Sequence, residues 1–399
     1  MSDRCDVLVV GGGIHGVGVA QAAAAAGHSV ILVEQRALAA GTSSRSSKLI
    51  HGGLRYLESG SLGLVRECLR ERTIMLSVAP ELVRLEQFYL PLYADGRRYQ
   101  WQLLTGLSLY ALLTGFGPGS GFARLKPGAA DLPDGLLQDG LKAIFRYQDA
   151  RTDDRALTRA VMASAMELGA RLLMPAELMS AQLGTDGVHA RCRMAGNETE
   201  IHCKALVNAA GPWATTVMAR VMPALAAMQV DLIQGTHLIF RDWRVQRNYY
   251  LENPRDGRGI FVLPWSDSTL VGTTETRFEG DPAAVRPKPA ERRYLLSAVR
   301  HYFPDTAPRD LSNATGFAGL RVLPSGSGHA FHRSRETLLE TDRRRNPRVL
   351  SIFGGKLTAW RATAEKVLAR IAGSLPERSP LADTSRLRLD PVDESWPGD

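Results

Sequence analysis

The sequence predicts an α/β fold in which a domain built on a parallel sheet is interleaved along the chain with a domain built on a mixed or antiparallel sheet. Strand–turn–helix units stand at both ends of the chain, over residues 6–34 and 349–372, and a region rich in short strands lies between them. Alternating strands and helices indicate a parallel sheet, whereas successive short strands indicate antiparallel pairing. One contiguous parallel-sheet domain followed by a separate second domain would not place such units at both ends.

The N-terminal unit has the clearest pattern. Asp6–Val10 is an aliphatic run that predicts a buried strand, and three glycines follow it. Ile14–Ala26 is rich in alanine and predicts a helix that Gly27 terminates. Ser29–Val33 predicts a second strand, which closes on Glu34. Together these segments form one βαβ unit.

The rest of the chain gives a coarser pattern of elements. Helices are predicted at Leu62–Val78, Asp153–Leu168, Lys288–Phe303 and Leu357–Ala372, and strands at Glu86–Tyr93, Ala205–Ala210, Val230–Phe240, Tyr249–Glu252, Gly259–Leu263, Thr269–Gly272, Thr315–Leu323 and Val349–Phe353. We assign residues 1–80, 146–225 and 311–373 to the parallel-sheet domain and residues 81–145 and 226–310 to the second domain. Residues 374–399, rich in Pro, Ser and charge, are predicted to be a fraying tail.

The composition of the chain limits the classes of binding partner that it suits. The chain has 399 residues, 44% of them hydrophobic, with a net charge of +8. A basic protein suits phosphorylated substrates, an anionic membrane surface or nucleic acid, but no nucleic-acid-binding motif is present, so we expect no nucleic acid partner. Four cysteines at unrelated spacings indicate neither disulfides nor a metal site, and the N-terminus is no signal peptide, so we expect a cytoplasmic protein. The apolar run Trp101–Phe116 predicts a buried helix or one that rests on the inner face of the cell membrane.

The glycines after the first strand form the pattern Gly-Gly-Gly-Ile-His-Gly. Gly11 permits the tight turn, Gly13 lets the backbone approach a pyrophosphate, and Gly16 allows close packing of helix on strand. The helix N-terminus attracts phosphates, and Glu34 can accept the ribose hydroxyls. The unit therefore predicts a Rossmann-like dinucleotide site.

Two other segments have the composition of a cofactor cradle. Residues Thr42 to Tyr56 are rich in hydroxyls and end in His-Gly-Gly-Leu-Arg-Tyr, and Gly354–Thr358 joins a strand end to a helix start. Amides and hydroxyls in such turns can surround phosphates and an isoalloxazine ring. The amides of Gly354–Thr358 are predicted to face the flavin pyrimidine, where negative charge grows on reduction. These segments favour FAD over NAD.

With these motifs the chain resembles the aerobic, FAD-dependent glycerol-3-phosphate dehydrogenases, within the D-amino-acid-oxidase-like flavoprotein superfamily. The resemblance runs in the family's order from residue 6 to about 372. The further motifs that carry it are Asp153–Arg155, Asn208–Trp213, Gly235–His237, Pro264–Trp265, Gly272–Glu275, Gly319–Arg321 and Phe353–Thr358. It implies an FAD-binding domain interleaved with a substrate domain in a D-amino-acid-oxidase-like fold.

The resemblance also implies a reaction and a set of cofactor contacts. A hydride passes from sn-glycerol 3-phosphate to N5 of non-covalently bound FAD, giving dihydroxyacetone phosphate, and the electrons leave to a quinone. The residues expected to bind FAD are Gly11, Gly13, Ile14, His15, Gly16, Glu34, Thr42, Ser43, Ser47, Lys48, Leu49, His51, Gly52, Gly211, Trp213, Gly354, Gly355, Lys356, Leu357 and Thr358.

The substrate and catalytic residues follow from the chemistry of a dianionic ester. The family's basic positions correspond to Arg55, Arg321, Arg335 and Lys356, with Tyr56 and Thr274 as hydroxyl donors. Arginine forks suit phosphate oxygens. His237 is the expected base, because a histidine supplies a pKa near 7 without large tuning, and His51 is the rival, expected to pack near the flavin. Arg321 and Lys356 complete the catalytic group, with Lys356 stabilising charge on the alkoxide.

Two departures from the family leave alternatives open. The C-terminal helical domain that relatives carry is expected to be absent, because the tail that ends at Asp399 is too short for one, and Gln234 stands where many relatives have lysine. The alternatives are an FAD-dependent enzyme acting on another polyol phosphate, a hydroxy acid or an amino acid, and a non-catalytic flavin-binding protein.

Overall fold

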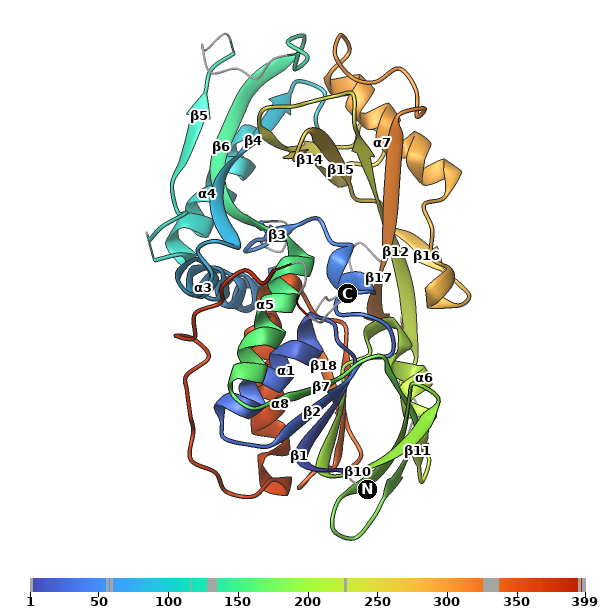
Figure 1. Cartoon of the computed structure of the whole chain (residues 1–399). Coiled ribbons are helices and arrows are strands. Elements are labelled where there is room, and N and C mark those ends of the chain that lie inside the picture. Colours follow the sequence, from blue (N-terminus) through green and yellow to red (C-terminus); the bar gives the residue numbers. More distant parts are fainter. Residues whose placement is uncertain are drawn as a thin grey trace.

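The computed structural model describes residues 3–54, 57, 60–115, 117–127, 135–225, 228–325, 337–393 and 396. Within these residues the strands form two sheets, of nine and ten strands. The nine-stranded sheet occupies the lower part of Figure 1 and the ten-stranded sheet the upper part. The predicted α/β class, with a parallel sheet and a second, mixed sheet, is confirmed.

The lower sheet has a parallel core in the order β19–β10–β1–β2–β7. These strands are β1 (Asp3–Val10), β2 (Val30–Val33), β7 (Arg171–Leu173), β10 (Asn197–Asn208) and β19 (Val349–Phe353). The first half of β10 pairs antiparallel with β9 (Val188–Met194), and β9 pairs antiparallel with β8 (Ala176–Leu183). The short β11 (Val221–Met222) pairs with β8, and β18 (Leu338–Thr341) pairs with β19. Val7, Leu8 and Val9 are fully buried in succession, as expected for a strand covered on both faces.

Three helices cover one face of this core. They are α1 (Ile14–Ala25), α5 (Asp154–Glu167) and α8 (Trp360–Ile371). Alanines let α1 approach both neighbours, and Gly18 is required where Trp360 crosses it, since a Cβ there would lie 2.6 Å from the indole. Asp153 caps α5, because its side chain accepts from the backbone amides of Arg155 and Ala156.

The upper sheet is mixed and largely antiparallel. Its strands are β3 (Leu49–Ile50), β4 (Val83–Tyr93), β5 (Phe122–Leu125), β6 (Leu141–Thr152), β12 (Val230–Phe240), β13 (Asn248–Glu252), β14 (Gly259–Trp265), β15 (Ser268–Gly272), β16 (Thr276–Phe278) and β17 (Ala314–Pro324). Helix α7 (Pro289–Tyr302) packs on one apolar cluster of the sheet, and α4 (Gln100–Leu113) packs on another. Helix α3 (Leu62–Val78) lies between α4 and α8, and the short α6 (Ala214–Met218) follows β10.

Several predicted elements differ from the structure. Strand β6 is not among the predicted strands, and its residues cross the expected domain limit at 145/146. Strand β17 pairs with β12 along its whole length, so the upper sheet continues to Pro324, past the expected limit at 311. Because β17 is so long, it carries the chain from the upper sheet down to the junction with the lower one (Figure 1). The domain limits themselves stay a prediction.

The expected fraying of the tail is wrong for its described part. Residues 375–393 run as an extended segment along the helices of the lower sheet (Figure 1). The Leu381 amide donates to the Ala25 carbonyl, and Leu389, only 2% exposed, enters the helix core and donates to the Val78 carbonyl. Buried leucine and backbone pairing outweigh a composition typical of disorder.

The apolar run Trp101–Phe116 forms most of α4, and Phe116 itself lies outside the described residues. Leu103, Leu107 and Tyr110 are buried, whereas Trp101 is 64% exposed. Among the helices that the structure describes, none is both long enough and apolar enough to cross a membrane.

Candidate active site

A cavity of about 360 Å³ lies where the two sheets meet, at the carboxyl ends of β1, β10 and β19. We call it the junction cavity. Ligands of open parallel sheets bind at this edge, because the strand ends leave a crevice there. Of the residues predicted to bind FAD, those that line it are Gly11, Gly13, Ile14, His15, Glu34, Thr42, Ser43, Ser47, Leu49, His51, Gly211, Trp213, Gly354, Gly355, Lys356, Leu357 and Thr358.

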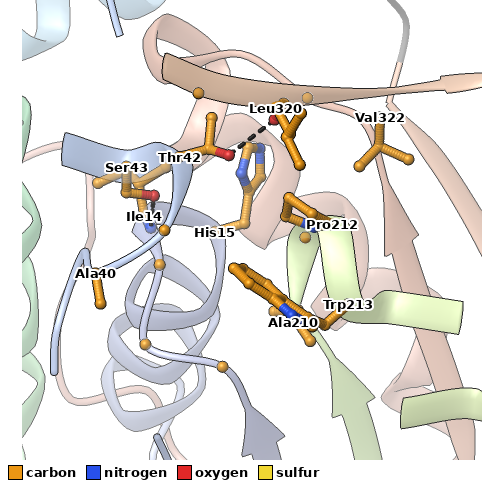
Figure 2. Close-up of a pocket in the computed structure, with 18 of the residues that line it drawn as sticks. Ile14, His15, Ala40, Thr42, Ser43, Ala210, Pro212, Trp213, Leu320 and Val322 are labelled. Atoms are coloured by element: carbon orange, nitrogen blue, oxygen red, sulfur yellow. Dashed lines mark hydrogen bonds between the residues drawn. The ribbon is translucent and has the colours of Figure 1, made fainter. Parts of the chain in front are cut away.

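The N-terminal glycines have the geometry that a pyrophosphate cradle needs. Gly11 has a φ of +111°, and a Cβ on Gly16 would lie 1.9 Å from the Gly11 carbonyl oxygen, so neither position accepts a side chain. Gly16 thus packs the turn against α1 and does not line the cavity. The Ile14 amide, at the start of α1, donates to the Ser43 hydroxyl at 2.9 Å (Figure 2). A helix N-terminus with an attached hydroxyl is suited to phosphate oxygens.

The acidic residue after β2 is oriented by the same turn. One oxygen of Glu34 accepts from the Gly12 amide at 2.7 Å, and the other accepts from the Arg36 amide at 2.8 Å. The carboxylate is therefore fixed at the cavity wall with lone pairs left for ribose hydroxyls.

The two distant glycine motifs meet at His15. A Cβ on Gly355 would lie 2.4 Å from Cε1 and Nε2 of the His15 ring, so the second glycine of the Gly-Gly-Lys turn is required for this contact. Burial lowers the pKa of His15 to about 4, so the ring is neutral. Its Nε2 is enclosed and has no hydrogen-bond partner among the described residues.

Figure 2 shows how the walls around His15 are joined. The Thr42 hydroxyl donates to the Leu320 carbonyl at 2.8 Å, which ties the loop after β2 to strand β17. Pro212 and Trp213, from the turn after β10, stand below them across the cavity. Segments far apart in the sequence therefore enclose one space.

His237 lines the far part of the cavity, on β12. Its Nε2 is 2.9 Å from the Ser47 hydroxyl, and its ring stacks on Phe317 with centroids 5.0 Å apart. Gly272 lies directly behind, since a Cβ there would be 2.1 Å from the ring. Burial, with smaller effects of Arg321 and Lys48, lowers the pKa of His237 to about 3. The expected pKa near 7 is wrong for this protein, because the imidazole is enclosed between strands and beside two cations.

Arg321 and Lys356 line the same cavity. The Arg321 guanidinium donates to Glu275 at 3.1 Å and to the Thr273 hydroxyl at 3.3 Å. It lies across Gly235, where a Cβ would be 3.0 Å from its Nη2. The glycine of Gly235–His237 therefore makes room for an arginine from the neighbouring strand.

Thr274 does not line the cavity. Its hydroxyl donates to Glu291 at 2.7 Å and accepts from the Thr236 amide at 2.9 Å, behind β12. The Glu291 carboxylate also accepts from the Thr236 hydroxyl at 2.7 Å and from the side-chain amide of Gln234 at 2.5 Å. Because residues alternate across a strand, Gly235 and His237 face the cavity while Gln234 and Thr236 face Glu291. The expectation that Thr274 donates a hydroxyl to the substrate is therefore not met by its placement.

Lys48 and Gly52, predicted to bind the cofactor, also lie outside the lining. The Lys48 ammonium is buried, pairs with Asp154 and donates to the Ser44 carbonyl at 2.7 Å. It fixes the loop after β2 to the start of α5. Gly52 instead meets Tyr110, whose hydroxyl accepts from its amide at 2.8 Å.

Arg55, Tyr56 and Arg335 lie outside the described residues, so half of the predicted cations have no placement here. The structure adds three lining arginines that the sequence reasoning missed, Arg36, Arg45 and Arg220. Burial and then the nearby Arg286 lower the pKa of Arg45, which marks a cation-rich wall. Arg45 lies within the hydroxyl-rich loop and could have been found there, whereas no local pattern marks Arg220.

Comparisons with known proteins agree with this geometry. The sequence profile of the FAD dependent oxidoreductase family matches residues 6–361. D-erythritol 1-phosphate dehydrogenase of Brucella abortus is 36% identical over 381 residues, covering 94% of this chain and 75% of that protein. Glycerol-3-phosphate dehydrogenase of Pseudomonas aeruginosa is 38% identical over 380 residues, covering 93% and 72%.

A solved structure extends the likeness to three dimensions. The glycerol-3-phosphate dehydrogenase from Bacillus halodurans, complexed with FAD, superposes with a TM-score of 0.74 at 28% identity, covering 97% of this chain and 68% of that one.

Proposed function

The chain belongs to the FAD-dependent oxidoreductase family, and we propose that it oxidises sn-glycerol 3-phosphate to dihydroxyacetone phosphate. Its cofactor is FAD, and its reaction class is the oxidation of a polyol phosphate. One observation carries the proposal: Arg321 and Lys356 line the same cavity as a neutral His237 and three glycine turns. Two cations beside a proton acceptor suit a phosphorylated secondary alcohol.

The residues present fit FAD. Side chains at Gly11, Gly16 or Gly355 would collide with the cradle, and the enclosed Nε2 of His15 is a polar atom that a bound ligand can satisfy. Glu34 is held by the turn after β1, and His51 and Thr358, joined to each other, line the same cavity as His237. We propose that Glu34 marks the ribose end and that His51, Thr358 and His237 mark the end that receives the flavin.

The chain's own residues then have separate tasks. When bound, FAD supplies the acceptor for the hydride that leaves the carbinol carbon. His237 takes up the hydroxyl proton, and its Ser47 hydrogen bond holds the ring in place. Lys356 stabilises negative charge on the alcohol oxygen, and Arg321 binds the phosphate, held in orientation by Glu275 and Thr273.

D-erythritol 1-phosphate is the second candidate substrate, because the Brucella abortus relative is named for it. The two esters share the phosphate and the secondary alcohol and differ by one hydroxylated carbon. Anaerobic stopped-flow mixing with each ester, and with D-amino acids and hydroxy acids, measures which of them bleaches the flavin fastest. We expect glycerol 3-phosphate to give the largest ratio of rate to half-saturating concentration. Faster bleaching by an amino acid would contradict the proposal, and no bleaching by any compound would indicate a non-catalytic flavin protein.

We also propose that a quinone accepts the electrons and that the protein docks on an anionic membrane face. The net charge of +8 and the exposed Trp101 support the docking. Flotation with anionic and neutral liposomes, at low and high salt, tests it, and a short-chain quinone tests the acceptor. Equal reoxidation by oxygen alone would remove the quinone from the proposal.

A further inference from the structure

His51 is a loop residue whose backbone is fixed from two sides. Its amide donates to the Thr358 hydroxyl oxygen at 3.0 Å, and that hydroxyl donates to the His51 carbonyl at 3.2 Å. The next amide, that of Gly52, donates to the Tyr110 hydroxyl oxygen at 2.8 Å. The peptide between residues 51 and 52 is therefore bonded at both its C=O and its N–H. Loop backbones more often bond to water than to distant side chains.

The Tyr110 hydroxyl belongs to a buried polar relay. It donates to Asp149, with Oδ2 at 2.9 Å, and Asp149 accepts from Arg72 at 2.6 Å. Arg72 further donates to the Gln148 and Gly119 carbonyls. Tyr110 is 2% exposed, Asp149 4% and Arg72 0%. Two donors thus meet at the Asp149 carboxylate: the Arg72 guanidinium and the Tyr110 hydroxyl. The Tyr110 oxygen in turn accepts from the Gly52 amide.

This relay costs stability unless every member is satisfied, because charges and hydroxyls are removed from water. It joins α3, α4, β6 and the loop after β3, which are far apart in sequence. Gly52 permits the approach, since a Cβ there would lie 2.5 Å from Leu69 and 2.6 Å from the Tyr110 oxygen. Among the described residues of the relay, neither Tyr110 nor Asp149 nor Arg72 lines the junction cavity.

The 51–52 peptide connects the relay to the cavity. His51 lines the cavity and its ring lies 6.5 Å from that of Phe261, whereas Tyr110 stands behind it. Groups that touch a cofactor keep their geometry when a second layer of hydrogen bonds holds them. A fixed imidazole beside a flavin changes the relative free energy of the oxidised and reduced ring, because their charge distributions differ.

We propose that Tyr110 is a positioning residue: its bridge between Asp149 and the Gly52 amide fixes the His51 imidazole against the flavin of bound FAD and so sets the reduction potential of that flavin. The proposal depends on FAD binding and not on which polyol phosphate is the substrate.

The test is Tyr110→Phe in the FAD-loaded protein, with Tyr147→Phe as the matched control. Tyr147 is also buried, at 4% exposure, and lies on the same strand as Asp149. Its substitution removes a hydroxyl that does not bond the Gly52 amide, which donates to Tyr110. We expect both variants to retain full FAD. Dye-coupled anaerobic reduction of Tyr110→Phe should show about a 2- to 10-fold change in the ratio of oxidised to reduced flavin at fixed potential, as the loss of one net hydrogen bond implies. Tyr147→Phe should match the wild type.

A double-mutant cycle separates positioning from general stability. In a His51→Asn background, Tyr110→Phe should no longer change the flavin potential, because the residue that it positions is gone. The proposal is overturned if Tyr110→Phe leaves the potential and the visible spectrum unchanged, if both tyrosine variants shift them equally, or if the effect persists without His51. Loss of FAD from Tyr110→Phe would also overturn it, since Tyr110 would then support the cavity as a whole. Substrate oxidation enters none of these readouts, so their failure is distinct from that of the proposed function.

Discussion

The two ends of the junction cavity are built by different means. The end beside Glu34 is made of backbone amides at the first glycine turn, and its geometry depends on the absence of side chains at Gly11 and Gly16. The end beside His237 is made of side chains, and His237 and Arg321 are held by partners from other segments. The first kind of site is rigid and local in sequence, whereas the second depends on long-range packing and charge.

The difference teaches that cofactor binding and substrate chemistry should fail separately in this protein. Substitutions in the glycine turns should remove FAD, whereas substitutions around His237 and Arg321 should leave FAD bound and change the reaction.

The largest expected effect is that of Gly16→Ala. Its Cβ would lie 1.9 Å from the Gly11 carbonyl, so the turn must open and the phosphate cradle is lost. We expect no FAD absorbance in the purified protein. Gly63→Ala in α3 is the control, because no atom lies within 4 Å of its Cβ position. Full flavin content in Gly16→Ala would refute the backbone account of this end.

His237→Gln should come next. Removing a general base slows the proton-coupled step by about 10²- to 10⁴-fold. We expect that fall in the rate of anaerobic flavin reduction by glycerol 3-phosphate, with normal FAD content. A normal rate would transfer the role of base to His51.

Arg321→Met should weaken substrate binding more modestly. Loss of a charged hydrogen bond to the phosphate predicts a rise in KM of about 10- to 100-fold, with FAD content unchanged. Arg277→Met is the control, because Arg277 and Arg321 both flank Ile233, on opposite sides of β12. Arg277 is 67% exposed and pairs with Asp231. Equal effects of the two substitutions would show that Arg321 acts only through the sheet.

The smallest effect is on acid stability. The pKa of His237 is about 3 in the folded protein, against 6.5 for a histidine exposed to water. Because the folded pKa is depressed, the stability it contributes is complete above pH 6.5 and is lost as the pH falls from 6.5 toward 3. At about 1.4 kcal/mol per pKa unit the loss approaches roughly 5 kcal/mol. Thermal unfolding of His237→Gln should therefore depend less steeply on pH over this range, and parallel curves would contradict the burial of a neutral ring.

The glycine turn beside Glu34 could be predicted from the sequence, whereas the side-chain contacts around His237 could not. The Gly-Gly-Gly-Ile-His-Gly unit was predicted correctly, because a strand, a turn and a helix follow one another within residues 6–34. The expected role of Thr274 and the pKa of His237 were not, because both depend on contacts between strands. Glu291 holds Thr274 away from the cavity from 17 residues further along the chain. No local pattern marks such a carboxylate.

The predictions for strand β6 and for the tail were wrong for related reasons. In β6, the charged Asp149 stands at a buried position where the alternation predicts an apolar residue, because its partners Arg72 and Tyr110 lie in other segments. In the tail, Leu389 stands between Arg388 and Asp390, and only its packing against the helices makes it a core residue.

The most direct test of the account compares two compounds that differ only in the phosphate. The oxidised holoprotein is titrated anaerobically with glycerol 3-phosphate and with glycerol, and flavin absorbance is followed. We predict bleaching by the ester and none by glycerol at equal concentration, since Arg321 and Lys356 would have no anion to bind. Equal bleaching by both compounds, or none by the ester, would contradict the claim that the end of the cavity beside His237 binds a phosphorylated alcohol.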